Sequence, residues 1–318
     1  MMSAFSKVLK RYAIGVVLIL LFAIGALTTK NFFTVKNITN VLRQISVTGV
    51  LALVESILII CGQIDLSLGH VVALAGMLST SAYLTTGSLF VAIITAIAVS
   101  TACLAISGVL IAKLKLTAFI VTMAMGFIAR GLCFLWTDGQ SIYDIGNYSV
   151  ISTTYIGPIP LPVIILFVFV LICAFIMNQT TLGRSIFSVG GNMAAAAASG
   201  INVRQTIINA YVLGGILTGI ATVLQIARVG SAVPSTADGY EGDAIAAAII
   251  GGTSFSGGVG TMFGVLIGTA IMGFLSNLLN LRGFDSYFQM VTKGLIIILA
   301  LILDNVLKNR KVRAKKSA

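Results

Sequence analysis

Few residues of this chain could do covalent chemistry, and they form no recognisable catalytic set. There is one histidine, His70, and the four cysteines have no paired spacing. No glycine is followed by lysine, so the phosphate-binding loop of ATPases is missing from the sequence. We therefore expect no enzymatic activity, no metal site and no cofactor, and we interpret the cysteines as small apolar core residues.

The polar residues that stand out lie in two glycine-containing stretches, 55–69 and 227–260, which interrupt otherwise apolar sequence. Irregular polar backbone persists at membrane depth only where protein buries it or where it lines a wet cavity. Gly-interrupted hydrophobic segments are also the best sequence indicator of a transport path. We predict that side chains from both stretches line such a path: Glu55, Gln63, Asp65, Ser67, Thr253, Ser254 and Ser256.

The composition indicates what must position these residues. The chain has 318 residues, of which 58% are hydrophobic and 9% charged, whereas a soluble domain is usually about a quarter charged. Residues 66–112, 145–183 and 244–281 contain no Asp, Glu, Lys or Arg, and a spanning helix needs about 20 apolar residues. The sequence therefore predicts an all-α polytopic membrane protein that lies in a lipid bilayer.

About ten transmembrane helices fit the hydrophobic pattern. We predict them near residues 12–29, 44–64, 68–85, 89–112, 117–136, 163–178, 205–227, 244–251, 261–281 and 287–303. The eighth is short, which is typical of a broken or re-entrant segment. The polar segment 138–162 and the segment 179–204 are predicted to be loops outside the membrane.

The basic residues predict the orientation of the chain. With the N-terminus inside, thirteen of the twenty Lys and Arg residues fall on the inner side and five on the outer side. We therefore predict cytoplasmic N- and C-termini and one permease domain over 1–318. It comprises a cytoplasmic segment 1–11, a membrane domain 12–304 with an inner loop 179–204, and a basic cytoplasmic tail 305–318. The net charge of +11 reflects this flanking pattern and indicates no nucleic-acid partner.

A weak internal similarity suggests duplication. IleIleCysGlyGln at 59–63 resembles IleIleGlyGlyThr at 249–253, and each precedes a span rich in Gly and Ala. Two five-helix halves would have opposite topology, because five is an odd number. We therefore predict two inverted halves with the path at their interface.

Three charged residues, Glu55, Arg130 and Lys293, fall within predicted spans, and such residues are functional candidates by default. Glu55 has two interpretations: it lies on the path, or it pairs with Arg130 or Lys293 to hold helices together. Three further acids, Asp238, Glu241 and Asp243, precede the eighth span on the outer side. We predict that they dock a basic partner surface, although Asp243 has a second interpretation as an N-terminal cap.

Several motifs, taken together and in order, resemble the permease subunits of bacterial ribose-type sugar ABC importers. They include GlnIleAspLeuSerLeuGly at 63–69, ThrAlaPheIleValThr at 117–122, ThrLeuGlyArg at 181–184, GlyTyrGluGlyAspAlaIleAlaAla at 239–247 and GlyGlyThrSerPheSerGlyGly at 251–258. The resemblance extends from about residue 31 to 304. It implies a bacterial inner-membrane subunit that imports a monosaccharide, such as a ribose-type pentose or a hexose.

The resemblance also implies partners. These are a cytoplasmic ABC ATPase subunit, a periplasmic sugar-binding protein, and a second permease, either a copy of this chain or a paralogue. Segment 179–204 matches the family's coupling region, and we expect it to carry a short helix that contacts the ATPase. Its residues would be Gly191 for a sharp entry, Asn192 as N-cap, Ala195 and Ala196 at the contact, and Gly200 as the stop.

Departures from the family pattern leave the substrate open. Glu55 stands within a span where Gly-Met-Thr is expected, and Gln63 and His70 replace smaller residues. The alternatives are a permease for a nucleoside, an autoinducer-like sugar or a branched-chain amino acid. A different class is an ion-coupled secondary carrier in which Glu55 binds a proton or a cation.

Overall fold

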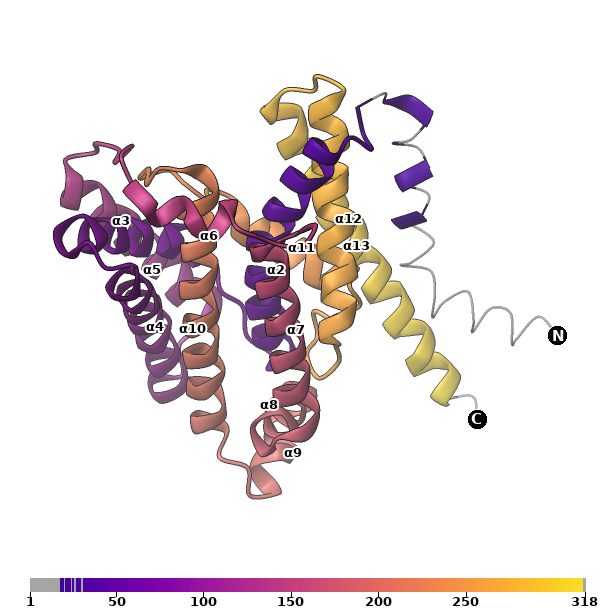
Figure 1. The fold of residues 1–318 in the computed structure, drawn as a ribbon. Helices are drawn as coiled ribbons and strands as arrows, with labels where there is room; N and C mark the ends of the chain where they lie inside the picture. The colour runs from indigo at the N-terminus through magenta and orange to yellow at the C-terminus, as the bar shows by residue number, and fades with distance from the viewer. Residues whose placement is uncertain (1–17, 20, 24, 26, 30, 317–318) are drawn as a thin grey trace.

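The computed structural model describes residues 18–19, 21–23, 25, 27–29 and 31–316, and it describes no side chains at 300 and 303–316. Most of this is helical, with one short antiparallel hairpin (Figure 1). The elements are α2 (Val35–Ile60), α3 (Leu68–Thr86), α4 (Leu89–Leu114), α5 (Ala118–Thr137), the 3-10 turn η1 (Gly146–Ser149), α6 (Val150–Thr153), β1 (Tyr155–Ile156), β2 (Ile159–Pro160), α7 (Leu161–Gln179), α8 (Thr181–Gly191), α9 (Met193–Ala198), α10 (Val203–Val229), α11 (Tyr240–Ile250), α12 (Met262–Leu281) and α13 (Ser286–Lys316).

Seven helices of the described residues are long and apolar enough to cross a membrane: α2, α3, α4, α5, α7, α10 and α12. They correspond to seven of the ten predicted spans. The predicted eighth is α11, which has 11 residues and is too short to cross alone. The predicted tenth begins α13, where 286–299 is apolar. The first, at 12–29, and the segment 1–11 lie largely or wholly outside the described residues.

Helix α10 occupies the centre of the fold. It packs mainly on α4 and also on α2 and α3, and Figure 1 shows α3, α4 and α5 on one side of it with α2, α7 and α11 to α13 on the other. Glycines permit this contact, because a Cβ at Gly215 or Gly219 would lie 2.5 Å from the Cα of Thr101 or Ile97 of α4. Small residues that allow close backbone approach are typical of membrane helix contacts.

The predicted similarity between residues 59–63 and 249–253 is also visible in the backbone. The N–H groups of residues 61–63 at the end of α2, and of residues 251–253 at the end of α11, donate to carbonyls at the same offsets. Gly62 (φ 77°) and Gly252 (φ 90°) occupy the left-handed position that ends each helix. The two sequences therefore form the same helix terminus.

The two matching helices run in the same direction. At one end of the pair, Gln44 of α2 and Asp243 of α11 face one small cavity. At the other end, the hydroxyls of Ser56 and Thr253 are hydrogen-bonded at 2.8 Å. The similarity therefore joins parallel segments, the second and eighth of the predicted spans, and gives no support to the predicted inverted halves.

Two segments approach the carbonyl oxygen of Ile60, the last residue of α2. The N–H of Gly258, in the loop between α11 and α12, donates to it at 2.9 Å. The end of α8 lies against it, because a Cβ built on Gly190 would be 1.7 Å from this oxygen. No side chain fits at residue 190 without moving the backbone of α2.

We therefore expect Gly190→Ala to destabilise the protein by about 1–3 kcal/mol, the usual cost of overpacking. The measurement is the thermal unfolding of the detergent-solubilised protein. Gly191→Ala is the matched control, because a Cβ at Gly191 meets nothing within 4 Å. Equal unfolding temperatures for the two variants would contradict the close contact at Ile60.

Candidate functional site

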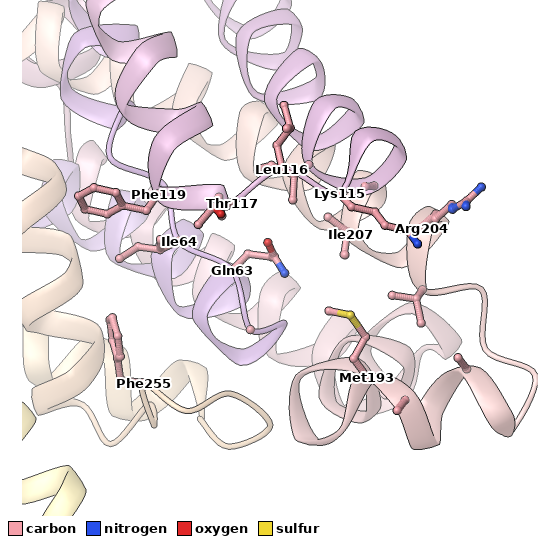
Figure 2. A pocket seen from close by; sticks show the side chains of 17 residues that line it. Gln63, Ile64, Lys115, Leu116, Thr117, Phe119, Met193, Arg204, Ile207 and Phe255 are labelled. Carbon is pink, nitrogen blue, oxygen red and sulfur yellow. The ribbon is translucent and has the colours of Figure 1, made fainter.

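A cavity of about 980 Å³ lies between the α2–α3 loop, the α4–α5 turn and α9 (Figure 2). The start of α10 and Phe255 of the α11–α12 loop complete its walls. The cavity thus collects residues from both glycine-containing stretches and from the inner loop. Its labelled side chains are Gln63, Ile64, Lys115, Leu116, Thr117, Phe119, Met193, Arg204, Ile207 and Phe255.

The lining is mostly apolar, with a few polar groups. Figure 2 shows the amide of Gln63 extending into the space between Thr117 and Met193. Lys115 and Arg204 lie on the side where α4 ends and α10 begins, and none of the described residues that line the cavity is acidic. Apolar walls with a small number of convergent polar groups are typical of sites for small molecules.

Buried hydrogen bonds hold the α2–α3 loop from behind the cavity. The hydroxyl of Tyr211 in α10 donates to the carbonyl oxygen of Ile64 at 2.9 Å. Asp65 Oδ1 accepts from the backbone N–H of Ser67 at 2.7 Å and from its hydroxyl at 2.5 Å. The N–H of Leu66 donates to the hydroxyl of Thr122 in α5. Asp65 and Ser67 are fully buried, so they shape the loop and do not line the cavity.

The predicted path residues therefore separate into groups. Gln63 is the one of the seven that lines the cavity. Thr253 is buried against Ser56, where it joins α11 to α2. Ser254 is half-buried, and its hydroxyl accepts from the N–H of Ser256, which is exposed next to the cavity residue Phe255. These residues form one loop at the edge of the cavity.

Glu55 is fully buried in α2, and neither carboxylate oxygen has a hydrogen-bond partner among the described residues. The hypothesis that it pairs with Arg130 or Lys293 is wrong. Arg130 Nη1 lies 3.1 Å from Asp238 Oδ1, and Lys293 Nζ lies 2.7 Å from Asp243 Oδ2. The fold brings an acid beside each of these two cations, and the distances between these residues along the sequence do not reveal it.

The predicted outer docking face is also wrong for two of its three acids. Asp243, in the first turn of α11, is 13% exposed and binds Lys293. Glu241 points inward, because its Oε2 is buried and lies 2.5 Å from a Cβ built on Gly69. Asp238 remains 42% exposed but is bound to Arg130. The turns of α11 direct the two later carboxylates toward α13 and α3.

The short helix predicted in the inner loop is α9. Asn192 is its N-cap, because Oδ1 accepts from the N–H of Ala195 at 2.9 Å, and Gly200 (φ 85°) follows its end. Ala195 is exposed, whereas Ala196 is buried against this chain, so only Ala195 is open to a partner. The role predicted for Gly191 is wrong, since its surroundings have room for a β-carbon and Gly190 occupies the tight position.

Two contributors to the site were missed by reasoning from the sequence. One is Tyr211, whose hydroxyl anchors the loop from a helix about 150 residues away in sequence. The other is the α4–α5 turn, where Lys115 adopts φ 56° and, with Thr117 and Phe119, forms one wall. In the sequence, Lys113 and Lys115 were used only to predict the orientation of the chain.

Comparison with known proteins identifies related chains. Residues 37–301 match the family described as Branched-chain amino acid transport system / permease component. The ribose import permease protein of Escherichia coli K12 is 39% identical over 295 residues, 91% of this chain and 92% of that protein. The D-allose transport system permease protein of the same strain is 38% identical over 303 residues, 93% and 92% of the two chains. The L-arabinose ABC transporter permease protein of Azospirillum brasilense is 32% identical over 317 residues, 98% and 91%. No solved structure matches this chain significantly.

Glu55 gives the prediction of this subsection. A charged carboxylate without a partner in a buried site costs several kcal/mol, so we expect Glu55 to be neutral. Glu55→Gln keeps the shape without a charge and should leave expression and thermal stability close to wild type. Glu55→Lys, the control, should prevent accumulation of folded protein in the membrane. A strong loss of stability in the Gln variant would show that Glu55 is charged and paired.

Proposed function

This chain belongs to the permease-component family that matches residues 37–301, and from that premise we propose that it is the membrane subunit of an ATP-driven monosaccharide importer. The observation that carries this proposal is the near full-length match to sugar permeases. The three relatives named above are permeases for ribose, D-allose and L-arabinose, and each covers more than nine-tenths of both chains. The chain itself is a multi-pass inner-membrane protein without an ATP-binding loop.

The path in this proposal runs between two permease subunits, either two copies of this chain or this chain and a paralogue. Its inner vestibule is the cavity around Gln63, where the amide can bind a hydroxyl and the apolar walls contact the carbon skeleton. A neutral sugar suits the amide and the apolar walls, while Lys115 and Arg204 lie on one side of the cavity, where α4 ends and α10 begins. Residues 1–318 act as one permease domain.

Charge supports the orientation. Lys115 and Arg204 line the cavity beside α9, and the C-terminal end of α13 lies toward the same end as α8 and α9 in Figure 1. Under the positive-inside rule this end is cytoplasmic, so segment 179–204 faces the ATPase and the tail 305–318 is cytoplasmic. The proposal includes the full count of ten spans and two inverted halves, for which the parallel repeat of 59–63 and 249–253 is no evidence.

The outer partner in this proposal is a periplasmic sugar-binding protein. Because Glu241 and Asp243 face inward, its docking acids are those exposed in the outer loops, namely Asp138, Asp144 and Asp285. Such rim charges act mainly on association rate and on salt dependence.

Uptake by the reconstituted complex tests the proposed function. The tagged chain is purified from its native host with its ATPase, placed in liposomes with ATP inside, and given its binding protein loaded with labelled ribose, allose, arabinose, leucine or a nucleoside. We expect ATP-dependent uptake of a monosaccharide. Uptake of leucine or a nucleoside alone would favour the other solute classes. Uptake on an ion gradient without ATPase would establish a secondary carrier.

A second prediction concerns the ATPase contact, for which the exposed face of α9 is the candidate. Ala195→Arg should leave a folded permease in the membrane but remove the ATPase from the purified complex, because a long charged side chain fills a close contact. Ala195→Ser is the control and should retain the ATPase. If the Arg variant keeps full sugar-stimulated ATP hydrolysis, α9 is not the coupling element, and the turn at Lys113 and Lys115 becomes the candidate.

A further inference from the structure

A group of three polar side chains outside the cavity joins α5, α3 and the loop before α11. Arg130 Nη1 lies 3.1 Å from Oδ1 and 3.2 Å from Oδ2 of Asp238. The same nitrogen lies 3.2 Å from Nε2 of His70, which is 3.8 Å from Asp238 Oδ1. We call Arg130, Asp238 and His70 the outer polar cluster.

The charges of this cluster make lipid tails an unfavourable neighbour. Arg130 is the thirteenth residue of α5, which places it about 18 Å along the helix from Ala118. Its side chain is 40% exposed in the single chain and that of Asp238 is 42% exposed. Charged side chains at such a depth face protein or a water-filled cavity, because lipid tails do not solvate them. The exposed side of this cluster therefore faces a wet space or another subunit.

A continuous stripe of α5 connects the cluster to the cavity. Phe119, Met123, Phe127, Arg130 and Phe134 fall within an arc of about 80°, since successive residues of an α-helix turn by about 100°. The four apolar members are 39–65% exposed. Phe119 lines the cavity at one end, and Arg130 lies about 16 Å farther along the same face. This face connects the cavity to the outer polar cluster, and it borders the path if the proposed function holds.

The ion pair leaves hydrogen-bonding capacity for a ligand. Both described bonds from Arg130 to Asp238 use Nη1, so Nη2 and Nε are directed elsewhere. Each oxygen of Asp238 can accept further bonds. The guanidinium also lies 5.8 Å from the ring centre of Phe134, which adds an apolar surface beside the charged groups. Donors, acceptors and an aromatic face together suit a polyhydroxylated ring.

We propose that the outer polar cluster is a transient sugar-binding site in the outer half of the path, where Arg130 and Asp238 bind hydroxyl groups of the monosaccharide. This inference rests on the proposed function. Arg130 donates to a hydroxyl oxygen and Asp238 accepts from a hydroxyl. His70 acts as a positioning residue, because its Nε2 contacts the guanidinium while its Nδ1 is buried against Gly126.

The rival role for the cluster is purely structural. In that case the ion pair only fastens the loop before α11 to α5, and any variant that keeps the pair keeps transport. Arg130→Lys separates the two roles, because lysine can pair with Asp238 but lacks the planar set of spare donors. The double variant Arg130→Asp with Asp238→Arg also keeps a pair but exchanges the positions of donor and acceptor. Asp243→Asn is the matched control, since it breaks the part-buried pair with Lys293, which lies away from the stripe.

The experiment measures, in the reconstituted complex with saturating sugar-loaded binding protein, both uptake and ATP hydrolysis. For Arg130→Lys and for the exchanged pair we expect sugar moved per ATP to fall about tenfold, with unfolding temperature and hydrolysis close to wild type. Asp243→Asn should lower stability or both rates together and leave their ratio unchanged.

The possible outcomes are distinct. If either pair-preserving variant moves as much sugar per ATP as the wild type, the proposed sugar contact is wrong and the ion pair has only a structural role. A loss of folding in both variants, without a change of ratio in the complex that survives, also overturns it. If the wild-type complex moves no monosaccharide, the proposed function itself is wrong. This result comes from the wild type alone, so it is distinct from a failure of the sugar contact.

Discussion

The contact at the carbonyl oxygen of Ile60 is the constraint on which the inner half of this protein depends. At membrane depth each backbone polar group needs an internal partner. The α11–α12 loop supplies one through the N–H of Gly258, and Gly190 allows α8 to come against the same oxygen. Two irregular loops and the inner loop are therefore fixed to one another by backbone, and none of them can shift alone.

This arrangement suggests how an inner partner could act on the path. Helix α9 follows α8 directly, presents Ala195 outward, and contributes Met193 to the wall of the cavity. Behind the facing wall, Tyr211 and Asp65 hold the α2–α3 loop that carries Gln63. A displacement of α9 would change the cavity directly. Through α8 it would also reach Ile60, which precedes the cavity residues Gly62, Gln63 and Ile64. Short rigid connections make such coupling geometrically direct.

The sequence was a good guide wherever the cause was local. The apolar pattern predicted ten spans, seven of which are described helices long enough to cross a membrane, and Asn192 and Gly200 marked the ends of α9, because capping depends on adjacent residues. It failed where a neighbour in space decides the outcome. Gly190 and Gly191 are equivalent in sequence, yet only Gly190 meets another backbone. Likewise the direction of the repeated helix termini depends on how helices pack, which a five-residue similarity does not encode.

The two ion pairs between Asp/Glu and Lys/Arg side chains of the described residues differ in exposure. The side chains of the Lys293–Asp243 pair are 27% and 13% exposed, whereas those of the Arg130–Asp238 pair are 40% and 42% exposed. In a pair that is shielded from water the attraction between the charges is stronger, but both charges have lost their hydration and are closed to a solute. A pair that remains open instead gives up part of that attraction. The open pair on the stripe of α5 therefore favours a role in solute contact, and the closed pair between α11 and α13 favours a structural role.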